Sequence, residues 1–216
     1  MPQIVPSILE NTKDKFLDTM SRELKLPGVE RLQVDFGDGE FVPNNILPVT
    51  EIDPLNPAFQ WEAHLMCRQP MEFLDYQICG FKTIIVHYEA YRLPTQLKIA
   101  LQQIKAQGME PGICLKIETP VEVLQEFAQD VRHFQLMSIN PGFQGTPFLE
   151  ESYGRIAKLR KICPNAIIEV DGGVNETNIK KVASAGADLL IAGSVITKVP
   201  DMAAAWGKLN MEMNRN

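Results

Sequence analysis

The sequence predicts an α/β fold, a (β/α)8 TIM barrel, built as a single domain over residues 1–216. Eight short apolar runs rich in β-branched residues alternate with stretches of helical apolar spacing, which favours a parallel sheet covered by helices. The length lies near the lower end of the usual size of such barrels. An open doubly wound sheet is the alternative. That fold typically has a Gly-rich turn after the first strand, and residues 6–10 contain no glycine.

The predicted elements follow from these periodicities in chain order. The eight predicted strands are Gln3–Leu9, Arg31–Gly37, Gln60–Met66, Thr83–Tyr88, Pro111–Ile117, His133–Ile139, Ala166–Gly172 and Asp188–Ser194. The helical patterns are Thr95–Gln107, Glu151–Lys161, Glu176–Ala185 and Met202–Met213. Between the second and third strands, Pro48, Pro54 and Pro57 predict that the second helix is short or broken.

Composition excludes several classes of protein. Hydrophobic residues make up 45 % and charged residues 22 % of the chain, which is typical of a globular domain. The net charge of −6 argues against a general electrostatic grip on nucleic acid or an anionic membrane. No apolar run approaches the ~18 residues that span a bilayer, and the first residues lack a signal-peptide pattern. Cysteines 67, 79, 114 and 163 form no CxxC pair and lie in mostly apolar stretches, which predicts reduced, buried thiols in a cytoplasmic protein.

Two glycine-containing turns predict a phosphate site. Gly172-Gly173 follows the seventh predicted strand, and Gly193-Ser194 ends the eighth. The loops after these two strands form the usual phosphate site of TIM barrels, and glycine lets backbone N–H groups approach phosphate oxygens. An ordinary glycine turn is the alternative interpretation of each.

Asp35 and Asp171 form a candidate acid–base pair on the second and seventh strands. If they face each other across the barrel mouth, one carboxylate can remove a proton from one face of a substrate carbon while the other protonates the opposite face. That chemistry inverts a carbon beside a carbonyl. Alternatively, each aspartate caps a helix or pairs with a lysine.

Further strand-end residues carry the same ambiguity between function and structure. His64 is a candidate metal ligand beside the two carboxylates, with a structural histidine as the alternative. His87 is a weaker candidate, and His133, which opens a strand at the bottom of the barrel, is interpreted as structural. Met66 and Met137 occupy inward positions, where core filling is the default interpretation.

Ordered motifs over nearly the whole chain resemble the ribulose-phosphate 3-epimerase family. They are Val5-Pro6-Ser7-Ile8-Leu9, Val34-Asp35, Asp38-Gly39-Glu40-Phe41-Val42-Pro43-Asn44, His64-Leu65-Met66, Val86-His87-Tyr88-Glu89-Ala90, Met137-Ser138-Ile139-Asn140-Pro141-Gly142-Phe143, Glu169-Val170-Asp171-Gly172-Gly173-Val174-Asn175, Ala185-Gly186-Ala187-Asp188 and Ala192-Gly193-Ser194. The resemblance implies a (β/α)8 barrel that interconverts ribulose 5-phosphate and xylulose 5-phosphate. It also implies two aspartates as acid and base, a divalent metal (zinc, manganese or iron) and a homo-oligomer.

Carried onto this sequence, the resemblance implies a set of site residues. Asp35 and Asp171 are catalytic, and Asp35, His64 and Asp171 hold the metal. The implied substrate- and phosphate-binding residues are Ser7, His64, Met66, Met137, Gly142, Phe143, Gly145, Gly172, Gly173, Gly193 and Ser194.

The chain departs from the family pattern at four positions. Gln33 replaces the first histidine of the metal site, and a neutral amide oxygen is a weak zinc ligand. Gly37 replaces a methionine, which removes a side chain from the pocket wall, and Gln144 replaces a glycine of the lid loop. Lys116 replaces an asparagine of the family pattern and is expected to point toward the same barrel mouth as the aspartates. In a pocket lined by carboxylates its ammonium can take the place of a metal cation and act as an altered electrophile. A solvated lysine paired with Glu118 or Glu89 is the alternative.

The leading functional hypothesis is an isomerase that epimerises a phosphorylated ketose by proton transfer between two aspartates. A lyase that forms a Schiff base on Lys116 is one alternative, and it requires a lysine of depressed pKa in a dry pocket. A sugar-phosphate-binding homologue without turnover is the other. Gln33 separates these hypotheses, because an active epimerase must tolerate this residue in place of a metal ligand, whereas a homologue without turnover need not.

Overall fold

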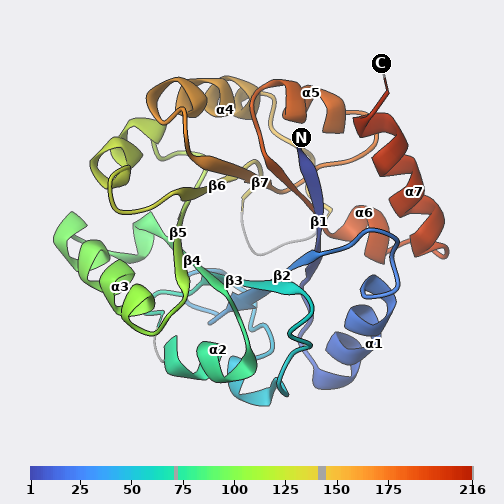
Figure 1. The fold of residues 1–216 in the computed structure, drawn as a ribbon, viewed down its shortest axis with the longest axis horizontal. Helices are drawn as coiled ribbons and strands as arrows, with labels where there is room; N and C mark the ends of the chain where they lie inside the picture. Colours follow the sequence, from blue (N-terminus) through green and yellow to red (C-terminus); the bar gives the residue numbers. More distant parts are fainter. Residues whose placement is uncertain (71–72, 141–144, 216) are drawn as a thin grey trace.

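The computed structural model describes residues 1–70, 73–140 and 145–215. Its core is a closed barrel of parallel strands in the order β1 to β8, with the helices in an outer ring (Figure 1). The strands are β1 (Gln3–Ile8), β2 (Arg31–Gly37), β3 (Gln60–Met66), β4 (Thr83–His87), β5 (Glu110–Leu115), β6 (His133–Met137), β7 (Ile167–Asp171) and β8 (Leu189–Ala192). The helices are α1 (Lys13–Glu23), α2 (Phe73–Cys79), α3 (Pro94–Ala106), α4 (Glu151–Ile162), α5 (Ile179–Ser184), α6 (Ser194–Thr197) and α7 (Met202–Met213).

The predicted barrel is confirmed, and all eight predicted strands overlap the observed ones. The face predicted for Thr95–Gln107 is the buried face of α3, made by Leu97, Ala100, Leu101 and Ile104. Three short 3-10 helices, η1 (Val49–Glu51), η2 (Tyr88–Ala90) and η3 (Val121–Phe127), complete the described elements. Because η1 is the only helical turn described between β2 and β3, the expectation of a short or broken second helix is confirmed. Among the described residues, no helix is long and apolar enough to cross a membrane.

The pleat of the strands divides the apolar shell from the barrel interior. In β2, Leu32, Val34 and Phe36 join the main core that packs between sheet and helices. Gln33 and Asp35 occupy the alternate positions and are also buried, so they face into the barrel. The interior is therefore partly polar, whereas the shell outside the strands supplies most of the apolar burial that stabilises the fold.

Gly37 lies where the loop after β2 packs back onto the barrel. A Cβ atom at position 37 would lie 2.9 Å from Ile46 Cδ1 and 2.9 Å from Val42 Cγ2. The backbone N–H of Ile46 also donates to the Gly37 carbonyl oxygen at 3.1 Å. Loop residues Val42 and Ile46 therefore fill the space that a larger side chain at position 37 would need.

The cysteines are free thiols. Cys79, Cys114 and Cys163 are buried as predicted, but Cys67 is only partly buried because it follows the last residue of β3, where the chain leaves the sheet.

A second polar layer lies toward the amino-terminal ends of the strands. Arg31 Nη1 contacts Glu62 Oε2 at 2.6 Å, and His133 Nε2 contacts Glu169 Oε2 at 2.6 Å. Burial, reinforced by the charge of Glu169, raises the pKa of Glu62 to about 8. Burial, reinforced by the charge of Asp171, likewise raises the pKa of Glu169 to about 8. His133 is thus tied to a buried carboxyl group, in keeping with its structural interpretation.

This layer predicts how stability depends on pH. A carboxyl group whose pKa is raised by folding stabilises the fold below its unfolded pKa, and that stabilisation is lost as the pH rises through the folded pKa. Glu169→Gln keeps the shape of the protonated acid without titrating. We therefore expect this variant to gain unfolding free energy relative to wild type as the pH rises from 4.5 to about 8. Chemical denaturation across that range measures the difference, with the exposed Glu118→Gln as control. A difference between Glu169→Gln and wild type that does not change with pH would contradict the buried titration.

Candidate active site

The centre of the barrel joins the two predicted catalytic aspartates through one imidazole. His64 Nδ1 lies 2.9 Å from Asp35 Oδ1 and 3.3 Å from Asp171 Oδ2. Asp35 comes from β2, His64 from β3 and Asp171 from β7, and the Asp35 and His64 side chains are almost fully buried. The carboxylates therefore meet in one cluster around this imidazole.

Two glutamine amides bind the same carboxylates. Gln33 Nε2 donates to Asp35 Oδ1 at 2.8 Å and to Asp171 Oδ2 at 3.1 Å, so each of its two N–H bonds serves one aspartate. Gln135 Nε2 donates to Asp171 Oδ2 at 2.9 Å and lies 3.3 Å from His64 Nδ1. The side-chain oxygens of both glutamines are buried without a hydrogen-bond partner. That cost, about 1–3 kcal/mol for each oxygen, is the consequence of turning both amide nitrogens toward the carboxylates.

These amides decide how the cluster fits a metal ion. Asp35, His64 and Asp171 offer ligand atoms within 4.8 Å of one another, and their donor types suit a divalent cation. However, N–H groups cannot coordinate a cation, and the Gln33 amide bridges the two carboxylates where an ion would bind them both. The hydrogen-bonded arrangement therefore does not fit a metal held between these carboxylates. An ion there would require Gln33 to turn its oxygen inward.

The cluster is arranged to hold protons near neutral pH. Burial, assisted by the charge of Asp171, raises the pKa of Asp35 to about 6, against hydrogen bonds from His64 and Gln33 that lower it. Burial also acts to lower the pKa of His64, but hydrogen bonds to Asp171 and Asp35 raise it well above its ordinary value. A carboxyl group with a pKa near 6 beside a second carboxylate is suited to exchange protons at neutral pH.

A cavity at the carboxyl-terminal ends of the strands brings most of the predicted substrate residues together. Its lining includes Ser7, Asp35, Met66, Met137, Gly145, Asp171, Gly172, Gly173, Gly193 and Ser194. His64 lies beneath it, in the cluster with the carboxylates. Gly142, Phe143 and Gln144 lie outside the described residues.

The glycines beside this cavity are required by close packing. Gly172 and Gly173 have positive φ angles of 114° and 67°. A Cβ atom at Gly173 would lie 2.5 Å from the backbone nitrogen of Phe148, and one at Gly172 would lie 2.3 Å from Ile139 Cγ1. Side chains are therefore excluded at both positions, and backbone lines this part of the cavity together with Gly193.

Lys116 follows β5 and lies over an aromatic ring. Its Nζ atom is 3.8 Å from the centroid of the Phe41 ring, and its backbone N–H donates to Glu89 Oε1 at 2.8 Å. Phe41 in turn packs against His87, with ring centroids 4.7 Å apart. The ammonium thus makes a cation–π contact at the mouth, and Glu89 is bound by the backbone of Lys116.

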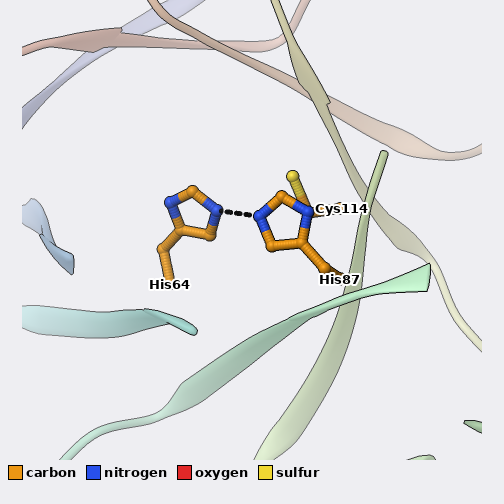
Figure 2. A group of neighbouring side chains, drawn as sticks. All are labelled: His64, His87 and Cys114. Carbon is orange, nitrogen blue, oxygen red and sulfur yellow. Dashed lines mark hydrogen bonds between the residues drawn. The ribbon is translucent and has the colours of Figure 1, made fainter. Parts of the chain in front are cut away.

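Sequence reasoning did not place Gln135 or Cys114 beside the site, and His87, its weaker candidate, contacts His64 directly. His64 Nε2 lies 2.9 Å from His87 Nε2, and the sulfur of Cys114 lies beside the His87 ring (Figure 2). The signal that could have found them is the period of two along a strand. Cys114 lies two residues before Lys116, and Gln135 two before Met137, so each shares the inward face of a residue already singled out.

A second, larger cavity is remote from this cluster. It measures about 830 Å³ and is lined by residues that precede β5, β6 and β7, among them Met109, Val131 and Ala166. It therefore opens at the amino-terminal face, where catalytic chemistry is not expected in this fold. The carboxyl-terminal cluster remains the candidate site.

Solved structures with the same fold cover almost the whole chain. A 3-hexulose-6-phosphate synthase superposes with a TM-score of 0.73 at 18 % identity and covers 98 % of this chain and 99 % of its own. The KGPDC of Streptococcus mutans gives a TM-score of 0.74 at 14 % identity, with 99 % and 98 % covered. At these identities the likeness shows the fold alone.

Sequence comparison reaches further than the fold. The chloroplastic ribulose-5-phosphate-3-epimerase of Arabidopsis thaliana is 35 % identical over 209 residues, which is 94 % of this chain and 74 % of the relative. The ribulose-phosphate 3-epimerase of Bacillus subtilis is 31 % identical over 204 residues, 91 % and 92 % of the two chains. The model of the ribulose-phosphate 3 epimerase family matches residues 3–197. The chain therefore belongs to the ribulose-phosphate 3-epimerase family, whose named members are isomerases acting on carbohydrates.

Proposed function

We propose that this protein epimerises a phosphorylated ketose of the ribulose 5-phosphate and xylulose 5-phosphate class. The observation that carries the proposal is the placement of Asp35 and Asp171 in one hydrogen-bonded cluster that lines the cavity at the carboxyl-terminal ends of the strands. Family membership supports the same reaction. A phosphorylated pentose is the proposed partner of this cavity.

The two aspartates divide the proton transfer. Among the described residues, the hydrogen bonds of the cluster use Asp35 Oδ1 and Asp171 Oδ2, and the substrate would meet the other oxygen of each carboxylate. One aspartate, ionised, removes the proton from the carbon beside the carbonyl and becomes protonated, and the electron pair passes to the carbonyl oxygen as an enediolate. The other, protonated, returns a proton to the opposite face, so the carbon is inverted and the total proton count is unchanged.

The loops after β7 and β8 support phosphate binding in the same cavity. Gly172 and Gly173 follow β7, Gly193 and Ser194 follow β8, and all four line the cavity with the catalytic aspartates. Backbone N–H groups and one hydroxyl group at these loops suit the oxygens of a phosphate dianion. The phosphate would then fix the sugar with its carbonyl end toward Asp35 and Asp171.

The alternative of a Schiff-base lyase receives less support from Lys116. The lining of the cavity described above does not include this lysine, whose ammonium group instead lies over Phe41. A sugar-phosphate-binding homologue without turnover would bind the same substrate, so only exchange of the substrate proton with solvent distinguishes it from an epimerase. The free thiols suit a reducing compartment such as the cytoplasm, and we further propose a homo-oligomer, as the family resemblance implies.

Removal of either carboxylate tests the proton transfer. Asp35→Asn and Asp171→Asn should each reduce exchange of the substrate proton with deuterated solvent by roughly 10²- to 10⁴-fold, because each supplies a general acid or base. Nuclear magnetic resonance of ribulose 5-phosphate in deuterium oxide measures the exchange. The matched control is Asp130→Asn, at an exposed position. Exchange at the wild-type rate in either active-site variant would rule out the two-aspartate mechanism, and no exchange in wild type would favour the binding homologue.

Affinity for the phosphate group tests the loops after β7 and β8. We expect ribulose to bind far more weakly than ribulose 5-phosphate, because charge-assisted hydrogen bonds are lost with the dianion. Calorimetric titration with both sugars gives the comparison. Equal affinities would show that the loops after β7 and β8 do not bind phosphate.

The Gln33 amide predicts weak binding of a hard metal ion between the carboxylates. Gln33→His replaces the bridging N–H donors by an imidazole ligand, so its affinity for Mn²⁺ should exceed that of wild type. Electron paramagnetic resonance of free Mn²⁺ during titration measures both affinities. Gln103→His, at an exposed position of α3, is the control for adding a histidine. Tight stoichiometric Mn²⁺ in wild type, unchanged by Gln33→His, would mean that the amide is no obstacle.

A further inference from the structure

Three side chains with metal-ligating atoms lie on successive strands beside the aspartate cluster. His64 comes from β3, His87 from β4 and Cys114 from β5, and their ligand atoms lie within 4.8 Å of one another (Figure 2). His87 and Cys114 are direct neighbours in the register of β4 and β5. All three side chains are buried, with residue exposures of 1 %, 0 % and 0 %. The ligand set therefore stands on three adjacent strands of the barrel.

The second nitrogen of each imidazole is held by a carboxylate. His64 Nδ1 lies 2.9 Å from Asp35 Oδ1, and His87 Nδ1 lies 3.4 Å from Glu89 Oε2. Histidines that bind metals commonly give their other N–H to a carboxylate in this way, which fixes the ring and exposes the remaining nitrogen to the ion. Here the two remaining nitrogens, both Nε2, face each other at 2.9 Å.

We propose that His64 Nε2, His87 Nε2 and Cys114 Sγ bind a divalent cation of borderline softness, of which Zn²⁺ is the type. Two imidazoles and one thiolate are zinc-binding donor types, and three such ligands leave a fourth tetrahedral position open. With Zn–N distances of about 2.0–2.1 Å, a tetrahedral ion needs the two nitrogens roughly 3.3 Å apart. The rings therefore need to separate by only a few tenths of an ångström from the observed 2.9 Å.

Charge balance favours an ion at this buried position. Two facing Nε2 atoms share one proton when they hydrogen-bond, and the free thiol of Cys114 carries another. A divalent cation that displaces both protons leaves the net charge of the cluster unchanged. Burial of the ion then avoids the large cost of placing an uncompensated charge in the barrel.

This position differs from the one between the carboxylates. It uses Nε2 of His64, whereas the contacts to Asp35 and Asp171 use Nδ1. The amide hydrogen bonds of Gln33 to both aspartates can remain in place. The inference thus goes beyond the proposed epimerase reaction, and a spectroscopic measurement tests it whether or not the protein turns over ribulose 5-phosphate.

Phe41 packs on one of the three ligands. Its ring packs on His87 at 4.7 Å between centroids, and the Lys116 ammonium lies over the same ring. The Glu89 carboxylate accepts from the Lys116 backbone N–H and contacts His87, so it lies beside the same ligand.

Cobalt titration of the whole protein tests the inference, because Co²⁺ reports thiolate coordination through a ligand-to-metal charge-transfer band in the near ultraviolet. We expect wild type to bind one equivalent of Co²⁺ with this band, and Zn²⁺ to displace it. Cys114→Ser should lose the band. Cys67→Ser changes the cysteine that is partly buried and should keep the band. Asp171→Asn should keep the band as well. Glu89→Gln should weaken the affinity by roughly 10- to 100-fold, because the carboxylate that orients His87 is lost.

Three results would overturn the inference. Bound Co²⁺ without a thiolate band, lost in Asp171→Asn, would place the ion between the carboxylates instead. A band that disappears in Cys67→Ser, or persists in folded Cys114→Ser, would assign it to another thiol. No binding of Co²⁺ or Zn²⁺ to wild type at any stoichiometry would reduce the three side chains to a hydrogen-bonded core group. The wild-type spectrum alone shows whether a thiolate binds the ion, and Cys67→Ser tests the partly buried thiol, so the inference can be overturned even where Cys114→Ser does not fold.

Discussion

The amide group of Gln33 holds two like-charged carboxylates together at the centre of the barrel, and the geometry of the site depends on this interaction. Desolvation and mutual repulsion both disfavour two ionised aspartates in one buried cluster. The N–H bonds of Gln33, with those of Gln135 and the His64 imidazole, offset that cost by donating to Asp35 and Asp171. The offset is incomplete, since the pKa of Asp35 remains raised to about 6. The residual destabilisation is useful, because it leaves a carboxyl group able to exchange protons near neutral pH.

The same amide has a second consequence for divalent cations. Its N–H groups donate to both carboxylates and so occupy the place where a cation would bind and neutralise them. One strand further along, His64 turns its other nitrogen toward His87 and Cys114. His64 thus lies between two candidate cation positions, and the residue at position 33 bears on the carboxylate position alone.

Sequence patterns reached the candidate site unevenly. Asp35, His64, Asp171 and the glycine turns were found because they stand at strand ends, in motifs that resemble a known family. Gln135 and Cys114 were overlooked because each lies within a mostly apolar run, where the pattern alone predicts a buried strand and not a functional side chain. Lys116 was expected to act as a cation toward the carboxylates. Its contact with Phe41 depends on where the loop after β2 folds back, which local sequence does not specify.

The sequence by itself determined the fold class, the strands and the helix faces, because hydrophobic periodicity is a property of neighbouring residues and survives without tertiary context. It also determined which strand ends carry polar groups. The tertiary structure decided which of those groups meet. His64 and His87 are 23 residues apart in the chain, and Gln33 and Asp171 are 138 apart, yet both pairs are in hydrogen-bond contact. Those contacts arise from strand register and barrel closure, which bring distant residues together through packing that no local pattern contains.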